Sequence, residues 1–266
     1  MPYSTGTLLD GKVAVVTGGG TGIGRAISTL FASEGARVVV NYSRSKQEAE
    51  DTAAEIQSKG GAAIAVQADI SRQPDADALM NAAASRFGRL DYLINNAGWS
   101  KRVPHEKFEE LTDEIWDRVF AINLRGAFYC VRAAAPLLKK QSGSAIVNIA
   151  SVAALLGQGS SMAYAASKGG MVTLTKSLAR ALAPAVRVNA VLPGFVRTRF
   201  ADWPQSAFDE AEKITPLRRL ATVEDVAQAT LFFAAHALGT TGETLVIDGG
   251  ATTLGPSTSE FAPPKI

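Results

Sequence analysis

Hydrophobic residues in this chain gather into short runs, separated by longer segments whose apolar residues recur at helical spacing. The short runs predict strands and the spaced segments predict helices. Gly35 and the pair Gly60–Gly61 follow two of the helical segments, which is typical of helix ends. Pro136 is expected to kink or shorten the longest helical segment. Strands are predicted at 13–17, 37–41, 63–66, 90–94, 145–149, 186–191 and 244–247, and helices at 22–35, 46–59, 75–87, 114–140, 162–182 and 223–235.

This regular alternation of strand and helix predicts an α/β fold with a doubly wound parallel sheet and helices on both faces. The strand segments are apolar almost throughout, as expected where both faces of a sheet are covered. No linker or change of composition divides the chain, so we expect a single domain over residues 1–254. The remaining residues, 255–266, contain three prolines and are expected to be loose or docked on a neighbouring subunit.

The composition is that of a globular protein, with 266 residues of which 47% are hydrophobic and 20% charged. The net charge of +2 is too small to indicate nucleic-acid binding. We find no apolar stretch long enough to cross a bilayer and no signal-peptide pattern at the N-terminus. Cys130 is the only cysteine, which excludes an internal disulfide and fits a cytoplasmic location. His105 and His236 lack partners at metal-binding spacing, so we expect surface roles for both and no metal site.

A glycine-rich turn follows the first predicted strand and opens the first predicted helix. Its sequence, Thr17-Gly-Gly-Gly-Thr-Gly-Ile-Gly24, places glycines at positions 18, 22 and 24. Glycines at such a point allow a tight turn and let a pyrophosphate approach the helix N-terminus. The position between strand and helix predicts a Rossmann-type dinucleotide site, although a glycine-rich connection without a ligand is the alternative.

The end of the second strand indicates which dinucleotide is preferred. An acidic residue there would bind the ribose 2′-hydroxyl of NAD, but the segment Asn41–Ser45 has no carboxylate. Arg44 could pair with the 2′-phosphate of NADP, and Ser43 and Ser45 could donate hydrogen bonds to it. We therefore predict NADP(H), with NAD(H) possible; the alternative is that Arg44 is a solvated loop residue.

A tyrosine and a lysine four residues apart, Tyr164 and Lys168, share one face of the helix predicted at 162–182. An ammonium beside a phenol favours the phenolate and is expected to lower the tyrosine pKa from its usual value of about 10. Ser151 lies thirteen residues before Tyr164. Together with the glycine turn, these residues predict a site for carbonyl and alcohol redox chemistry.

On these motifs the chain resembles the short-chain dehydrogenase/reductase superfamily, and the resemblance runs from about residue 9 to residue 250. It implies a sheet of order 3-2-1-4-5-6-7 and a homotetramer in which Phe128, Tyr129 and Leu138 face a partner. It also implies a catalytic tetrad of Asn123, Ser151, Tyr164 and Lys168. The implied cofactor contacts are Gly18, Thr21, Gly22, Ile23, Gly24, Ser43, Arg44, Asp69, Ile70, Asn96, Ala97, Gly98, Tyr164, Lys168, Pro193, Gly194, Val196 and Thr198.

The family implies specific roles for the tetrad. Tyr164 would be the general acid in reduction and the base in oxidation, and Lys168 would lower its pKa and bind the nicotinamide ribose. Ser151 would stabilise the developing alkoxide, and Asn123 would hold a water that links Lys168 to solvent. The alternatives are that Ser151 only caps a turn and that Asn123 only bonds the backbone. Asp69 and Asp248 are as compatible with structural capping.

Within the superfamily the chain resembles the 3-oxoacyl-[acyl-carrier-protein] reductase group, although the segment 180–187 is shorter than that group usually has. We expect substrate contacts from residues 99–104, 152–158 and a loop at about 196–215, whose aromatic residues favour a partly apolar substrate. Lys101, Arg102, Arg197 and Arg199 could meet an anionic group or could be solvated. The predicted activity is an NADP(H)-dependent oxidoreductase acting on CH–OH donors.

Two other function classes stay open at this point. One is a catalytically silent dinucleotide-binding redox sensor or scaffold protein, although such proteins usually lose the Tyr or the Lys. The other is an isomerase, epimerase or dehydratase on the same fold, although those are usually longer after the position of Pro193.

Overall fold

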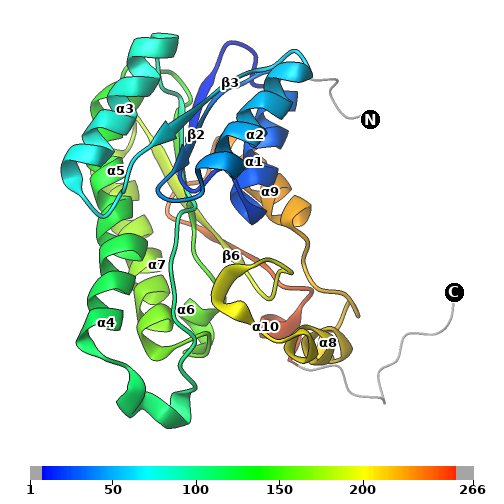
Figure 1. Ribbon diagram of the computed structural model, residues 1–266. Helices are drawn as coiled ribbons and strands as arrows, with labels where there is room; N and C mark the ends of the chain where they lie inside the picture. The colour runs from blue at the N-terminus through cyan, green and yellow to red at the C-terminus, as the bar shows by residue number, and fades with distance from the viewer. Residues whose placement is uncertain (1–7, 256–266) are drawn as a thin grey trace, which may run out of the picture.

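The computed structural model describes residues 8–255, and a seven-stranded parallel sheet forms its centre (Figure 1). The strand order is β3-β2-β1-β4-β5-β6-β7, which confirms the order that the family resemblance implies. The strands β1 to β3 are added toward one edge of the sheet and β4 to β7 toward the other. The topological switch point of this open α/β sheet therefore lies between β1 and β4. The strands are β1 (Val13–Val16), β2 (Arg37–Tyr42), β3 (Ala62–Gln67), β4 (Tyr92–Asn95), β5 (Ala145–Ile149), β6 (Arg187–Pro193) and β7 (Thr244–Ile247).

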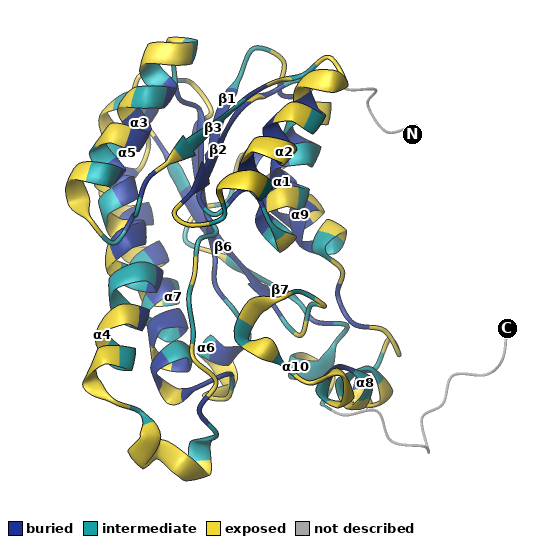
Figure 2. Ribbon diagram, in the orientation of Figure 1, coloured by how far each residue is buried: buried dark blue, intermediate teal, exposed yellow. Residues whose placement is uncertain are grey.

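Helices cover both faces of this sheet. On one face α1, α2 and α9 pack together, and on the other α3, α5, α4 and α7 do so (Figure 1). The central strands are buried, the edge strands β3 and β7 are only partly so, and the helices expose their outer faces (Figure 2). The longer helices are α1 (Gly22–Ser33), α2 (Lys46–Ser58), α3 (Gln73–Phe87), α4 (Asp113–Phe120), α5 (Ala127–Leu138), α7 (Met162–Leu182), α8 (Gln205–Ile214) and α9 (Val223–Leu231).

The long helix predicted at 114–140 is present, but a π-helical turn divides it. That turn, η2 (Ala121–Gly126), separates α4 from α5 and carries Asn123. Pro136 lies inside α5, which continues for only two more residues. The π turn is the main irregularity because it widens the helix where a functional residue lies, a common use of such turns. Leu138 is fully buried in the core, so the prediction that it faces a partner is wrong.

Several short elements after the strands were not predicted. All of them lie at the end of the molecule where the strands finish, together with α8 (Figure 1), except η4, which continues the helix predicted at 223–235 toward the amino edge of the sheet. The 11 residues at 256–266 lie outside the described residues, so the predicted behaviour of the tail is untested. Among residues 8–255, no helix combines the length and the apolar character needed to cross a membrane. The short elements are η1 (His105–Glu110), α6 (Ala153–Leu156), η3 (Phe200–Asp202), η4 (Phe232–His236) and α10 (Ala251–Leu254).

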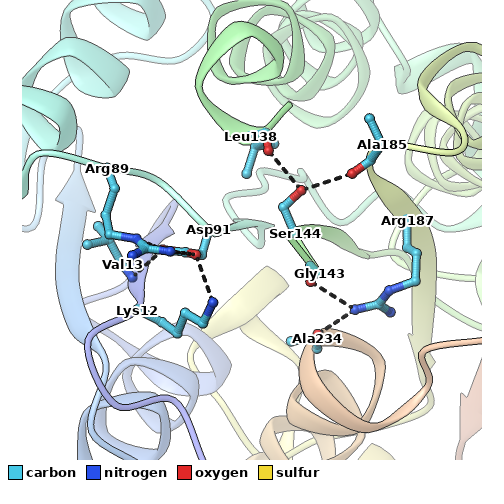
Figure 3. Close-up of polar contacts among 10 residues, drawn as sticks. All are labelled: Lys12, Val13, Arg89, Asp91, Leu138, Gly143, Ser144, Ala185, Arg187 and Ala234. Atoms are coloured by element: carbon cyan, nitrogen blue, oxygen red, sulfur yellow. Dashed lines mark hydrogen bonds and ion pairs between the residues drawn. The ribbon is translucent and has the colours of Figure 1, made fainter. Parts of the chain in front are cut away.

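A buried carboxylate joins the amino ends of β1 and β4 (Figure 3). Asp91, 1% exposed, accepts hydrogen bonds from the Val13 amide at 3.0 Å and from both Nε and Nη2 of Arg89 at 2.8 and 2.7 Å. Lys12 Nζ lies 3.4 Å from the same carboxylate. A paired and hydrogen-bonded carboxylate is the form in which burial of a charge is tolerated.

A second polar group at the same edge of the sheet closes the end of η4. The Arg187 guanidinium donates to the carbonyl oxygens of Phe233 and Ala234, both at 2.6 Å, and to that of Gly143 at 3.4 Å (Figure 3). The Ser144 hydroxyl donates to the Leu138 carbonyl at 3.0 Å. These contacts satisfy helix-end carbonyls. They lie at the amino edge of the sheet, so the carboxyl edge is left for the site.

Candidate active site

A cleft of about 1100 Å³ runs along the carboxyl ends of the strands. Residues that follow β1, β2, β3, β4, β5 and β6 all line it, as the switch-point rule for open α/β sheets predicts. The cleft brings the glycine turn, the end of β2 and three of the four predicted catalytic residues, Ser151, Tyr164 and Lys168, to one continuous surface. Their roles stay predictions.

The glycine turn is shaped for a close backbone approach. Gly18 and Gly22 have φ values of +61° and +51°, which favour glycine. The site of an added Cβ at Gly24 lies only 2.1 Å from the Gly18 carbonyl oxygen, so Gly24 allows α1 to pack on the turn rather than lining the cleft. Thr21 precedes α1 without a side-chain cap, and the first turn of α1 has no acidic residue. The helix thus presents uncapped N–H groups to the cleft.

The end of β2 forms one end of the cleft. Ser43 and Arg44 are exposed there and line it, as predicted. Asn41, which the sequence analysis did not assign, is buried; its Oδ1 accepts from the Gly18 amide at 3.2 Å and its Nδ2 donates to the Ala68 carbonyl at 3.1 Å. A polar residue at the end of an apolar strand was the available signal for this role. Asn41 fixes the glycine turn against β2 and the segment after β3.

Tyr164 and Lys168 lie in the first two turns of α7, on the face that meets β5. Ser161 caps this helix by accepting the Tyr164 amide at 3.2 Å. Lys168 is 4% exposed, and its Nζ donates to the Ile149 carbonyl at 2.7 Å and lies 5.7 Å from the centre of the Tyr164 ring. Ser151 Oγ accepts the Ala153 amide at 3.1 Å and lies near enough to the Tyr164 hydroxyl to lower the pKa of that phenol. Ser151 therefore caps its turn and also meets the tyrosine.

The electrostatics of the pair differ from the sequence-based prediction. Desolvation raises the pKa of Tyr164 to about 12, and the hydrogen bond with Ser151 opposes that rise only in part. Desolvation also lowers the pKa of Lys168 to about 8. The expected net lowering of the tyrosine pKa is thus wrong for this structure, because burial of the phenol raises the pKa by more than the contact with Ser151 lowers it. At neutral pH the tyrosine holds its proton and the lysine is largely charged.

Asn123 lies behind the cleft rather than in its lining. Its Oδ1 accepts from the Trp99 amide at 2.8 Å, and its Nδ2 donates to the Trp99 carbonyl at 3.0 Å and to Ser167 Oγ at 3.1 Å. Ser167 in turn donates to the Tyr164 carbonyl at 2.7 Å. The amide of Asn123 therefore ties the loop after β4 to the helix turn that carries Tyr164. The predicted water beside Asn123 stays a prediction.

The segment after β4 is held against the glycine turn. Asn96 Nδ2 donates to the carbonyls of Thr17 at 2.9 Å and Gly18 at 3.1 Å. Asp69 accepts from the Ser71 amide and hydroxyl at 3.0 and 2.7 Å, so it caps a turn as well as lining the cleft. Of the predicted cofactor contacts, all except Gly24 line the cleft: Gly18, Thr21, Gly22, Ile23, Ser43, Arg44, Asp69, Ile70, Asn96, Ala97, Gly98, Tyr164, Lys168, Pro193, Gly194, Val196 and Thr198.

Aromatic side chains surround the catalytic end of the cleft. Phe200 packs on Tyr164 with ring centres 5.5 Å apart, and the Arg118 guanidinium lies 4.2 Å from the centre of the Trp99 ring. Trp203 packs edge-on against Phe195 at 5.2 Å. Of these six side chains, the five other than Tyr164 come from α4 and from the loops after β4 and β6. The end of the cleft near Tyr164 is therefore aromatic and partly apolar.

His105 was expected to have a surface role, and this is wrong. The residue lines the cleft, and its Nε2 is buried without a hydrogen-bond partner among the described residues. Glu48, on the first turn of α2, also lines the cleft and was not predicted. Their positions depend on how η1 and α2 pack, and no local sequence signal reports that packing.

The fold and site have clear relatives among known proteins. A family profile described as "Enoyl-(Acyl carrier protein) reductase" matches residues 18–252. The chain is 40% identical over 245 residues to ketoacyl reductase 2 of the granaticin polyketide synthase from Streptomyces violaceoruber, covering 91% of this chain and 96% of that one. It is 38% identical over 247 residues to a 3-oxoacyl-[acyl-carrier-protein] reductase from Synechocystis, covering 92% and 98%.

A solved structure shows the same fold. The short-chain dehydrogenase/reductase from Brucella melitensis, titled a glucose/ribitol dehydrogenase, superposes with a TM-score of 0.85 at 36% identity and covers 92% of this chain and 98% of its own. The matches span nearly the whole chain, and the Tyr, Lys, Ser and glycine-turn positions meet in one cleft. The chain therefore belongs to the short-chain dehydrogenase/reductase superfamily, in the group that resembles the 3-oxoacyl-[acyl-carrier-protein] reductases.

Proposed function

We propose that this oxidoreductase reduces a ketone to a secondary alcohol with NADPH, and that Tyr164 supplies the proton. The observation that supports the proposal most directly is the meeting of Ser151 and protonated Tyr164 in the cleft that the glycine turn lines. A tyrosine whose pKa lies near 12 holds its proton at neutral pH, which suits an acid in reduction more than a base in oxidation.

The cleft fits a nicotinamide dinucleotide. The uncapped amino end of α1, without an acidic residue in its first turn, suits a pyrophosphate. The exposed Ser43 and Arg44 at the end of β2 suit a 2′-phosphate, and no carboxylate lies between Asn41 and Ser45. When bound, the nicotinamide supplies or accepts the hydride. Arg44 and the serines would then select NADP(H).

Three side chains would act on the substrate carbonyl. Ser151 would donate a hydrogen bond to the substrate oxygen and stabilise the charge that develops there. Tyr164 would deliver its proton to that oxygen as the alkoxide forms. Lys168, charged at neutral pH and held by the Ile149 carbonyl, would stabilise the phenolate that remains. Asn123 would keep Tyr164 in place through Trp99 and Ser167.

The substrate class follows from the relatives and from the aromatic wall of the cleft. The two relatives from Streptomyces violaceoruber and Synechocystis are named ketoacyl or 3-oxoacyl reductases, and Trp99, Phe200 and Trp203 give this chain an apolar site. We therefore propose a 3-oxoacyl thioester or another partly apolar ketone as the substrate. A cytoplasmic location stays a prediction from the sequence.

This function is tested by following NADPH and NADH absorbance against a panel of ketones that includes a 3-oxoacyl thioester. We expect NADPH to be consumed with at least one partly apolar member, and faster than NADH. Failure of both cofactors with every member would contradict the reductase proposal and favour a binding role instead. Alcohols of the responding ketones, offered with NADP⁺, give the reverse reaction.

The rate of ketone reduction should fall as pH rises through about 8. Lys168 loses its charge there because burial lowers its pKa, whereas Tyr164 stays protonated to much higher pH. Alcohol oxidation should instead rise with pH, because it needs the tyrosine to accept a proton. A pH–rate profile in both directions measures this. A reduction rate that stays constant up to about pH 10 would show that the lysine charge has no part in the step.

Arg44→Ala should weaken NADPH binding about 10-fold and change NADH binding less than about 2-fold, because the 2′-phosphate loses one charge-assisted partner. Fluorescence titration of both cofactors measures the change. Arg86→Ala is the matched control, since Arg86 is an exposed arginine whose guanidinium lies over Phe87 outside the cleft. Equal losses for both cofactors would contradict the assignment of Arg44 to the 2′-phosphate.

We propose a homotetramer that uses the groove between α4, α5 and α7. The groove has a volume of about 1180 Å³, and Phe120, Leu124 and Phe128 lie along it. The Arg132 guanidinium lies over Phe128 and Tyr129, at 5.6 and 5.1 Å from their ring centres. Light scattering at micromolar concentration should give four times the 27.9 kDa mass of the chain. A monomer would contradict this expectation.

A further inference from the structure

One ion pair crosses the cleft from the segment after β6 to α2. Arg199 Nη2 lies 3.0 Å from Glu48 Oε1, although the two residues are 151 positions apart in the chain. Both residues line the cleft. Most of the Arg199 side chain is exposed, at 78%, so the pair does little for stability and its significance lies in where it holds the guanidinium.

The neighbours of Arg199 define that place. Thr198 lies on the glycine turn, since a Cβ added at Gly22 would come within 3.3 Å of Thr198 Cγ2. Phe200 packs on Tyr164. Three consecutive residues thus contact the amino end of α1, the first turn of α2 and the catalytic tyrosine. Arg199 is directed toward the adenosine end of the cleft, away from the tyrosine, because Glu48 belongs to α2.

Glu48 is an unusual neighbour for an NADP(H) site. It is the only acidic residue in the first turn of α2 and follows Ser45 by three residues. A carboxylate near this ribose accepts hydrogen bonds from hydroxyl groups and repels a 2′-phosphate. The backbone amide of Glu48 itself and, after it, the hydrogen bond from Arg199 lower the pKa of the Glu48 carboxyl and so favour its ionised form. The guanidinium has five N–H donors, which leaves donors for a second anion.

We propose that Arg199 is a cofactor-specificity residue. Its guanidinium, positioned by Glu48, binds the 2′-phosphate of NADP(H) alongside Arg44 and masks a carboxylate that would otherwise favour NAD(H). The proposal rests on the NADP(H) dependence proposed above. It assigns cofactor selection in part to the segment that also covers the substrate, so one loop contacts both ligands.

If Arg199 neutralises Glu48 as well as binding the phosphate, the effects of substituting the two residues should depend on each other. Arg199→Ala removes an attractive charge and also uncovers the repulsive charge of Glu48. Glu48→Gln in the same chain removes the repulsion again. The two substitutions should therefore be non-additive, with the second one improving NADPH binding only when the first is present.

The test is the Kd of NADPH and of NADH, measured by fluorescence titration at low salt on the full-length chain. We expect Arg199→Ala to weaken NADPH about 10-fold and NADH less than about 2-fold. Glu48→Gln alone should change NADPH binding less than about 2-fold. The double variant should bind NADPH about 3-fold more tightly than Arg199→Ala does. Arg197→Ala is the matched control, because Arg197 lies on the same segment but pairs with Asp209 and Glu212 outside the cleft lining.

The other outcomes overturn either the proposed NADP(H) preference or the proposed role of Arg199. A wild-type chain that binds NADH more tightly than NADPH overturns the cofactor preference in the proposed function, and this proposal with it. A wild-type chain that prefers NADPH overturns this proposal alone if Arg199→Ala leaves the preference unchanged, or if it weakens both cofactors equally. If the double variant binds NADPH no more tightly than Arg199→Ala does, the guanidinium does not mask the charge of Glu48.

Discussion

Tyr164→Phe should reduce the kcat/KM for ketone reduction about 1000-fold or more, while the Kd of NADPH stays within about 2-fold of wild type. The substitution removes only the hydroxyl that we assign to proton transfer, and general acid catalysis of this kind is worth about 100- to 10,000-fold. The ring, which packs on Phe200 at 5.5 Å, is retained, so the cleft should keep its shape. Steady-state rates and cofactor titration on the same preparation measure the two effects.

Tyr129→Phe is the matched control for this prediction. Tyr129 is a half-buried tyrosine on α5 outside the cleft, and its hydroxyl has no assigned role. The Tyr129→Phe variant should retain a kcat/KM for ketone reduction within about 2-fold of wild type. A Tyr164→Phe enzyme with more than about a tenth of wild-type kcat/KM would exclude Tyr164 as the proton donor. Loss of cofactor binding in that variant would instead indicate a structural role for the hydroxyl.

Asp91→Ala should lower the free energy of unfolding by about 3 kcal/mol, because it leaves a buried amide and a guanidinium without their acceptor. The Asp91 carboxylate receives the Val13 amide and two donors of Arg89 at the amino ends of β1 and β4. This loss of stability is at the lower end of the range for breaking a buried ion pair, because the Arg89 side chain is 35% exposed and can be hydrated when its partner is removed. Urea unfolding at fixed protein concentration measures the change.

Asp10→Ala is the control for charge removal, since Asp10 is exposed and should change stability by less than about 0.5 kcal/mol. The loss of stability for Asp91→Asn should lie between those for Asp91→Ala and Asp10→Ala, because the asparagine side-chain oxygen can still accept from the Val13 amide. A loss smaller than about 1 kcal/mol for Asp91→Ala would show that the amino edge of the sheet does not depend on this carboxylate.

The regular part of the fold follows closely from the sequence. The strand at 145–149 and the helix at 162–182 were predicted to the residue. A mostly apolar run, broken only by Asn148, specifies a strand covered on both faces. The strand predicted at 90–94 instead runs from Tyr92 to Asn95, since Asp91 precedes it as a side-chain acceptor rather than a strand residue. Ser151, Tyr164 and Lys168 could be proposed as catalytic residues because two of them share one helix face and the third follows a strand, and all three line the cleft.

What the sequence missed depends on tertiary packing. Helix α8 has only ten residues and a single buried one, Phe208, and it lies within the segment that was expected to be a loop. The raised pKa of Tyr164 comes from desolvation, which the position of a neighbouring lysine does not report. Arg199 and Glu48 meet across 151 residues, and only the fold brings them together. Boundaries of the domain at 1–254 stay a prediction.

The central claim is that this chain transfers a hydride from NADPH to a ketone carbon. The most direct measurement uses NADPH carrying deuterium on the transferred position of nicotinamide C4, with a ketone from the panel, and mass spectrometry of the product. We predict a secondary alcohol with one deuterium on its carbinol carbon, formed by the wild-type chain and lost in Tyr164→Phe. Consumption of NADPH without deuterium in the product, or equal labelling by the Tyr164→Phe chain, would contradict the account.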